Sequence, residues 1–217
     1  MKIKNAIFDL DGTLIDSMYL WRAYEVDILE ELGGFQFSDY QRQKYLTMSL
    51  KDMVVSAEKQ FPVKYDNKEV CARAISAMEP LYFSGKLEFK PYAVEFLKKL
   101  KDAGVGVALA TATPKSSCVP FLEKTGVLKY FDCILTTHDD IKVDKFKGPD
   151  IYDAALKALN ADKETTVVFE DVIQCIKTCK NNGYYAIGIE DRVQGETVHD
   201  IKSLADRFIT SYNEIYI

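Results

Sequence analysis

A short apolar run near the start of the chain ends in two aspartates and constrains the fold more than any other segment. The run covers residues 5–9, and Asp9 and Asp11 are followed at once by Gly12 and Thr13. We interpret it as a buried strand that delivers Asp9 to its carboxyl end, with a tight turn placing Asp11 beside it. Two carboxylates there are unfavourable unless a divalent metal, a phosphate-binding cation or a shared proton lies between them. The pair therefore predicts a functional site.

Helical periodicity replaces the strand pattern directly after this pair. Asp16 and Ser17 begin the region, and the residues alone allow either a part in the site or a capping role for the next helix. Apolar residues then recur at three- and four-residue spacing, with breaks at Gly33-Gly34 and Pro62. We therefore predict an all-helical cap domain over residues 16–87, inserted into a chain that otherwise follows a different pattern.

Strand and helix patterns alternate in the rest of the chain. Runs that are apolar on both faces alternate with amphipathic helices, which indicates a parallel sheet covered by helices on both sides. The predicted fold class is therefore α/β, with a doubly wound parallel sheet formed by residues 1–15 and 88–217 and the helical cap between them. The strands expected after the first one cover residues 105–111, 131–136, 166–169, 185–189 and 207–210.

Composition excludes several classes of protein. A net charge of −5 without a concentrated basic patch argues against general nucleic-acid binding. No run reaches the ~18 apolar residues of a membrane span, and the chain enters a strand directly, without a signal-peptide pattern. The five cysteines are odd in number and scattered, which is typical of reduced thiols, and the chain has only two histidines, so a zinc site is not expected. We expect a cytoplasmic protein.

Polar residues follow three of the expected strands. Right-handed crossovers send the carboxyl ends of parallel strands to one edge of the sheet, so Asp9, Asp11, Thr111, Glu170 and Asp171 should meet there. A group of carboxylates without histidine or cysteine partners favours Mg²⁺. Asp9 is then placed as a nucleophile, Asp11 as a proton donor and Thr111 as a hydroxyl facing a phosphoryl oxygen.

Segments in four parts of the chain resemble, in the right order, the motifs of the haloacid dehalogenase (HAD) superfamily. The helical insert is similar to the small cap of the phosphatase and β-phosphoglucomutase subgroup. The resemblance spans essentially the whole chain. The matching segments are Phe8–Leu14 with Asp16-Ser17, Leu109–Thr111, Lys147–Tyr152 and Val167–Asp171.

The resemblance implies a role for each acid of the site. Asp9 would attack phosphorus and form an aspartyl-phosphate, while Asp11 would act as general acid and then as base for the attacking water. Asp9, the backbone carbonyl of Asp11 and Asp171 would hold Mg²⁺. Glu170 would assist directly or through water.

The resemblance also implies how the phosphoryl group is bound, although the lysine loop departs from the family pattern. Thr111 and the Ala112 amide would hold the group. The usual lysine lies four residues before the aspartate of the loop, a position that Phe146 occupies here. Lys147 is one residue too close and Lys145 one too far. We predict Lys147, because a loop that contains glycine can shift by one residue, with Lys145 as the alternative.

The resemblance implies that true dehalogenases and phosphonatases have a residue other than aspartate at the position of Asp11. The presence of Asp11 therefore favours phosphoester chemistry. Trp21 stands where the β-phosphoglucomutases carry a histidine, and the segment 47–52 lacks their glycine and arginine. We therefore predict a phosphatase of small phosphomonoesters, such as a sugar phosphate, with Trp21 as a substrate contact and a monomer or weak dimer as the assembly. A phosphosugar mutase is the alternative.

Two further classes remain open. A receiver-like switch also phosphorylates an aspartate on such a sheet, but the D-x-D-G-T spacing and the helical insert argue against it. A non-catalytic phosphate-binding relative is disfavoured by the intact Asp9, Asp11, Thr111 and Asp171.

Overall fold

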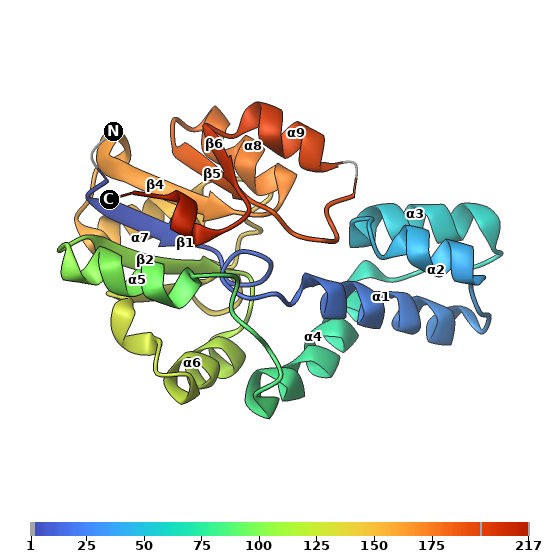
Figure 1. The fold of residues 1–217 in the computed structure, drawn as a ribbon. Helices are drawn as coiled ribbons and strands as arrows, with labels where there is room; N and C mark the ends of the chain where they lie inside the picture. Colours follow the sequence, from blue (N-terminus) through green and yellow to red (C-terminus); the bar gives the residue numbers. More distant parts are fainter. Residues whose placement is uncertain (1–2, 196, 217) are drawn as a thin grey trace.

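A parallel sheet with its first strand near the middle organises the protein (Figure 1). The structure is a computed structural model that describes residues 3–195 and 197–216. The sheet is six-stranded, with the order β3-β2-β1-β4-β5-β6. Its strands are β1 Asn5–Phe8, β2 Gly106–Thr111, β3 Cys133–Thr136, β4 Thr166–Glu170, β5 Tyr185–Ile189 and β6 Arg207–Ile209.

The α-helices fall into two groups (Figure 1). One group packs on the two faces of the sheet, and the other extends to one side of it. The first group is α5 Ala93–Asp102, α6 Lys115–Lys124, α7 Asp150–Leu159, α8 Ile173–Asn181 and α9 Thr197–Leu204. The second group is α1 Met18–Gly33, α2 Asp39–Tyr45, α3 Leu50–Gln60 and α4 Asn67–Ser84.

The strand order reverses at β1, which sets the position of the site. Phe8 at the end of β1 pairs with Leu109 of β2 on one side and with Phe169 of β4 on the other. An open α/β sheet binds ligands in the crevice outside the strand ends at such a reversal. The prediction of a doubly wound parallel sheet is therefore confirmed, and its switch point lies directly before Asp9.

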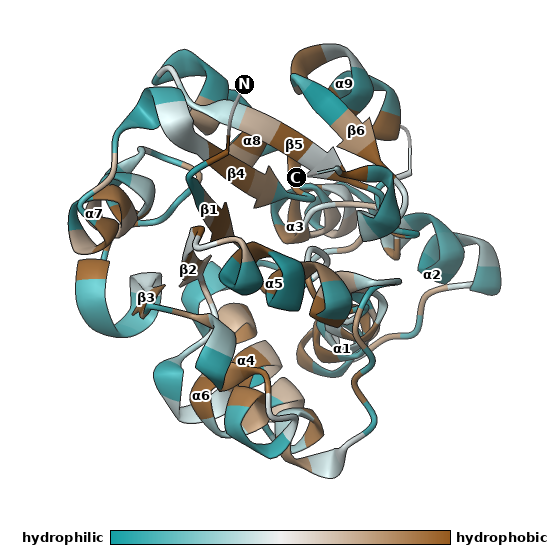
Figure 2. Cartoon of the chain, turned by 60° about the vertical axis from the view of Figure 1, so that its left-hand side comes forward, coloured by the Kyte–Doolittle hydropathy of each residue, from teal (hydrophilic) through white to brown (hydrophobic). Residues whose placement is uncertain are grey.

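Each face of the sheet has its own apolar layer. Ala6 and Phe8 point into a cluster with α5 and α6, whereas Ile7 points into a second cluster with α7 and α8. Phe8 also stacks on Phe169 with 4.4 Å between ring centroids. Figure 2 shows the central strands as mostly hydrophobic, whereas the helices around them carry hydrophilic as well as hydrophobic residues. The pairing of Phe8 with Phe169 brings the residues that follow β1 and β4 side by side.

The helices α1–α3 and the first half of α4 enclose a third apolar cluster away from the sheet. The second half of α4 differs, because Met78 and Tyr82 belong to the core cluster that includes α6. The chain leaves and re-enters the core through adjacent segments, where the Asp16 amide donates to the Glu88 carbonyl. We propose that residues 16–87 form a cap domain, with α4 reaching from the cap into the core.

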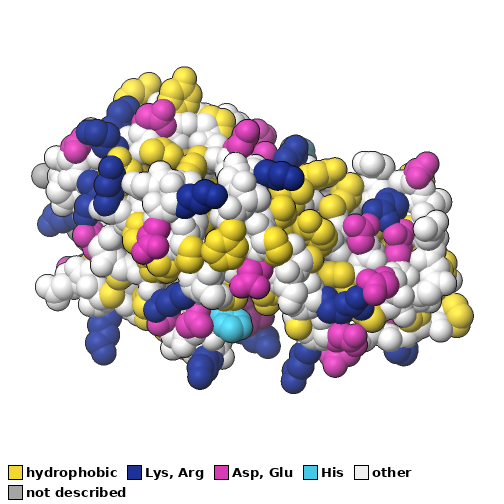
Figure 3. Space-filling model, turned by 90° about the horizontal axis from the view of Figure 1, so that it is seen from below, with side chains coloured by type: hydrophobic (Ala, Val, Ile, Leu, Met, Phe, Trp, Pro, Cys, Tyr) yellow, Lys and Arg dark blue, Asp and Glu magenta, His cyan; other side chains and the backbone are white. Residues whose placement is uncertain are grey.

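Among the described α-helices, α2 and α9 are the shortest. The helix α2 begins at a capping box in which Ser38 and Gln41 bond reciprocally, and α9 fills the connection between β5 and β6. Within the described ranges, no helix is long and apolar enough to cross a membrane. On the face shown in Figure 3, lysines and arginines are interspersed with acidic side chains.

Candidate active site

Three buried carboxylates lie together at the switch point. Asp9 follows β1 directly, and its amide donates to the Phe169 carbonyl at 3.1 Å, so the pairing of β1 with β4 continues into the site. Glu170 ends β4, and Asp171 follows it. One oxygen from each of Asp9, Glu170 and Asp171 lies within 4.8 Å of the others. The sheet therefore brings these residues together as the sequence predicted.

The carboxylate group fits a divalent cation such as Mg²⁺. Glu170 Oε1 accepts hydrogen bonds from Tyr152 at 2.7 Å and Lys145 at 3.0 Å. Glu170 Oε2 is buried and has no hydrogen-bond partner among the residues that the structure describes. A buried oxygen of this kind is costly unless a ligand satisfies it. The atoms that would bind the cation are all carboxylate oxygens, which are hard ligands of the kind that Mg²⁺ prefers.

Gly12 lets the turn after β1 approach this group. Its φ of +82° is one that side chains rarely adopt, and an added Cβ would lie 2.2 Å from Asp171 Oδ2. The Thr13 hydroxyl donates to Asp171 Oδ1 at 3.1 Å and orients that carboxylate. The glycine–threonine pair therefore serves to hold Asp171 against the turn.

Burial makes ionisation of the three carboxylates unfavourable when no cation lies beside them. It raises the pKa of Asp9 to about 7, with Lys145 opposing the rise. It also raises the pKa of Asp171, to which the charges of Asp9 and Glu170 add. Burial disfavours the charged form of Lys145, but the two neighbouring carboxylates outweigh it and raise the pKa of Lys145. A divalent cation beside the carboxylates would favour their ionised forms.

The structure places Lys145, the alternative, at the site and not the predicted Lys147. Lys145 Nζ lies 2.5 Å from Asp9 Oδ1, and the side chain is 5% exposed. Lys147 is exposed. A turn at Asp144 explains the difference, because its carbonyl accepts from the Lys147 amide at 2.9 Å and its side chain accepts from the Phe146 amide. The turn accounts for the extra residue between Lys145 and Asp150, and it directs Lys145 inward.

Asp11 has its side chain outside the three-carboxylate group. Its Oδ1 accepts from Ser17 and Tyr82, each at 2.6 Å, and from Trp21 at 3.1 Å. Its Oδ2 accepts from Thr113 at 2.5 Å. A carboxyl with these partners, two residues from Asp9, is suited to proton transfer rather than to metal binding through its side chain.

The end of β2 contributes the remaining predicted residues. Thr111 is buried, and its hydroxyl accepts from the Thr113 amide at 3.1 Å, while Ala112 between them is exposed. The contacts of Thr113 and Tyr82 with Asp11 were not predicted from the sequence. A threonine two positions after Thr111 was the available signal for the first. Trp21 was predicted as a substrate contact, and the structure places its indole N–H on Asp11.

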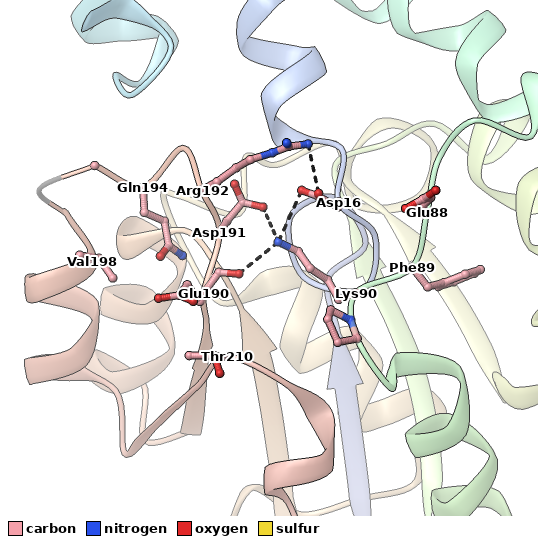
Figure 4. Close-up of a pocket in the computed structure, with 12 residues that line it drawn as sticks. Asp16, Glu88, Phe89, Lys90, Glu190, Asp191, Arg192, Gln194, Val198 and Thr210 are labelled. Atoms are coloured by element: carbon pink, nitrogen blue, oxygen red, sulfur yellow. Dashed lines mark hydrogen bonds and ion pairs between the residues drawn. The ribbon is translucent and has the colours of Figure 1, made fainter. Parts of the chain in front are cut away.

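Asp16 belongs to an ion-pair cluster beside the site rather than to the carboxylate group. Lys90 Nζ lies 2.6 Å from Asp191 Oδ2 and 3.8 Å from Asp16 Oδ1, and Arg192 lies 3.1 Å from Asp16 Oδ2. These side chains line a cavity of about 670 Å³ (Figure 4). Asp16 lies where the chain leaves the core for the helices α1–α4, and Lys90 lies where the chain comes back. The ion pairs of Asp16 therefore connect these two segments with each other and with the loop after β5.

Comparisons with known proteins agree with this geometry. A family model described as haloacid dehalogenase-like hydrolase matches residues 6–189. Validoxylamine A 7'-phosphate phosphatase of Streptomyces hygroscopicus subsp. limoneus is 28% identical over 203 residues, covering 94% of this chain and 90% of that protein. Hexitol phosphatase B of Escherichia coli (strain K12) is 33% identical over 184 residues, covering 79% and 77%. The solved structure of beta-phosphoglucomutase from Clostridium difficile is similar in fold, with a TM-score of 0.73 at 18% identity and coverage of 99% and 94%.

Proposed function

The chain belongs to the haloacid dehalogenase-like hydrolase family, and from that premise we propose that it is a Mg²⁺-dependent phosphatase of small phosphomonoesters. One observation carries the proposal. Asp9 lies inside the carboxylate group and against Lys145, whereas Asp11 lies outside that group with hydrogen-bond donors of its own. A nucleophile and a proton donor are thereby held in different surroundings two residues apart.

In the first step, the Asp9 carboxylate attacks phosphorus. The bond from Asp9 to phosphorus forms as the bond from phosphorus to the alcohol oxygen breaks, and Asp11 gives its proton to that oxygen. Lys145 orients Asp9 and offsets negative charge on the phosphoryl oxygens. Asp9, Glu170, Asp171 and the Asp11 carbonyl would hold Mg²⁺, which would supply further positive charge.

In the second step, water cleaves the aspartyl-phosphate. Asp11, now ionised, takes a proton from the water as its oxygen bonds to phosphorus, and the bond to the Asp9 oxygen breaks. Phosphate leaves, and both aspartates return to their starting forms. Thr111 and the Ala112 amide, at the end of β2, would hold the phosphoryl group through both steps.

The substrate class is proposed from relatives and from the cap. One relative carries the name of a phosphatase for validoxylamine A 7'-phosphate and another that of a hexitol phosphatase. We propose a phosphorylated polyol or sugar for this chain as well. The likeness to a beta-phosphoglucomutase concerns the fold, and it keeps a phosphosugar mutase as the alternative.

Phosphate release from a panel of hexitol and sugar phosphates tests the proposal. We expect release with Mg²⁺, loss with EDTA, and loss in Asp9→Asn protein under both conditions. Failure of the purified protein to hydrolyse any member of the panel would overturn the phosphatase assignment. Conversion of β-glucose 1-phosphate into glucose 6-phosphate without net phosphate release would instead favour the mutase.

A further inference from the structure

The four donors on Asp11 come from three separate parts of the chain. Ser17 lies before α1, Trp21 in α1, Tyr82 in α4 and Thr113 after β2. Three of these donors converge on Oδ1, whereas Thr113 is the donor recorded on Oδ2 within the described residues. A carboxyl oxygen offers about two acceptor sites. Oδ1 is therefore saturated, and Oδ2 is the oxygen with room for a transferable proton.

Tyr82 is the member of this group whose aromatic ring is buried against α6. It is 1% exposed, and its ring meets Phe121 edge-on, with centroids 6.1 Å apart at 82°. Its hydroxyl lies 2.6 Å from Asp11 Oδ1 and 3.3 Å from Thr113 Oγ1. It thus contacts both the saturated oxygen of Asp11 and the donor to the other oxygen.

A purely structural role would not require this hydroxyl. A phenylalanine would fill the same space against α6 without burying an oxygen, and burying a hydroxyl is unfavourable unless it forms hydrogen bonds. In the described residues, the Tyr82 hydroxyl donates to Asp11 and lies beside the Thr113 hydroxyl, both at the site. The hydroxyl is therefore explained by the orientation of Asp11.

We propose that Tyr82 is a positioning residue that turns the Asp11 carboxyl so that Oδ2 carries the proton for the leaving oxygen. This inference rests on the proposed phosphatase function. It also links the cap to the chemistry, since α4 begins in the cap cluster at Val70 and ends at the core beside α6. Movement of α4 would then change the orientation of Asp11 together with access to the site.

The dependence of kcat/KM on the leaving group tests this role, because kcat/KM covers only the steps up to the aspartyl-phosphate, in which Asp11 acts as the acid. An alkoxide leaving group needs a proton, whereas p-nitrophenolate leaves readily as an anion, so loss of general-acid positioning should affect only the first. For Tyr82→Phe we expect kcat/KM for an alkyl phosphate to fall about tenfold. We expect kcat/KM for p-nitrophenyl phosphate to stay within about twofold of the unsubstituted protein. Asp11→Asn should show the same selectivity in kcat/KM with a larger loss, while hydrolysis of the common aspartyl-phosphate slows for both esters.

Tyr45→Phe is the matched control, because Tyr45 is also buried and its hydroxyl bonds Ser56 and Gln60 inside the cap. The Tyr45→Phe substitution should leave kcat/KM for both esters unchanged. Thr113→Val removes the donor on Oδ2 and provides a second test, with the same selective loss expected. Equal losses of kcat/KM on both esters, or an unchanged kcat/KM for the alkyl phosphate, would overturn the role of Tyr82. Failure of the proposed function is distinguishable, because the unsubstituted protein would then hydrolyse neither ester.

Discussion

Lys145 Nζ lies 2.5 Å from Asp9 Oδ1 although 136 residues separate them in the chain. The same amino group lies 3.0 Å from Glu170 Oε1, so one buried cation contacts both the proposed nucleophile and a proposed metal ligand. This contact depends on the turn at Asp144, which points Lys145 inward while Lys147 is exposed.

Substitution of the two lysines separates their roles. Lys145→Met should lower kcat for phosphate release on the order of 100-fold, because the site loses a fixed positive charge beside Asp9 and the phosphoryl group. Lys147→Met is the matched control and should leave kcat within about twofold, since an exposed lysine contributes little through screened solvent. The opposite ranking of the two variants would restore Lys147 as the active-site lysine.

Tyr152 should tune metal affinity through Glu170. Its hydroxyl donates to Glu170 Oε1 at 2.7 Å, and residues that orient metal ligands typically affect affinity. We expect Tyr152→Phe to weaken Mg²⁺ binding roughly tenfold, measured by calorimetric titration. Tyr184→Phe is the control, because Tyr184 packs against Tyr152 at 5.9 Å but bonds Asp153 outside the site. Equal affinities in Tyr152→Phe and Tyr184→Phe proteins would contradict this role.

Mg²⁺ should stabilise the folded protein through the three carboxylates. At a concentration of 100 times Kd, binding to the folded state alone adds about 2.7 kcal/mol to the free energy of unfolding. Thermal melts with Mg²⁺ and with EDTA measure the gain. Asp171→Asn should abolish it, while Glu123→Gln on the exposed surface of α6 should keep it. A full Mg²⁺ shift in Asp171→Asn protein would place the metal elsewhere.

Gly12 and Gly34 offer a test of the turn after β1. Both have positive φ, of +82° and +68°, but only at Gly12 would a Cβ strike Asp171, whereas nothing lies within 4 Å of it at Gly34. Gly34→Ala should cost about 1 kcal/mol of stability through its backbone alone. Gly12→Ala should in addition lose Mg²⁺-dependent phosphate release, and unimpaired release by that variant would show that the close approach is dispensable.

Much of the fold followed from local patterns. The alternation of apolar strands with helices predicted the parallel sheet, and Asp9 and Glu170-Asp171 could be placed together because parallel strands end at one edge. The family, the fold class and an enzyme that hydrolyses phosphate monoesters are confirmed. The helix α2 was predicted only as part of the helical segment 16–87, because its seven residues hold little periodicity, although Ser38 and Gln41 have capping-box spacing.

The site residues that the sequence misplaced are those whose positions depend on tertiary contacts. Spacing alone cannot choose between Lys145 and Lys147, since the turn at Asp144 depends on the packing of the whole loop. Tyr82 lies on a helix whose pattern marks it as a core residue, and only the fold shows its hydroxyl on Asp11. The roles of the individual site residues and the limits of the cap domain stay predictions.

The most direct test is to trap the phosphorylated enzyme. Rapid acid quenching during turnover of a radiolabelled phosphomonoester with Mg²⁺, followed by peptide mapping, identifies the residue that carries the phosphoryl group. We predict a hydroxylamine-sensitive label on the peptide that contains Asp9, and neither label nor turnover in Asp9→Asn protein. A label on a different residue, or turnover by Asp9→Asn protein, would contradict the assignment of Asp9 as the nucleophile.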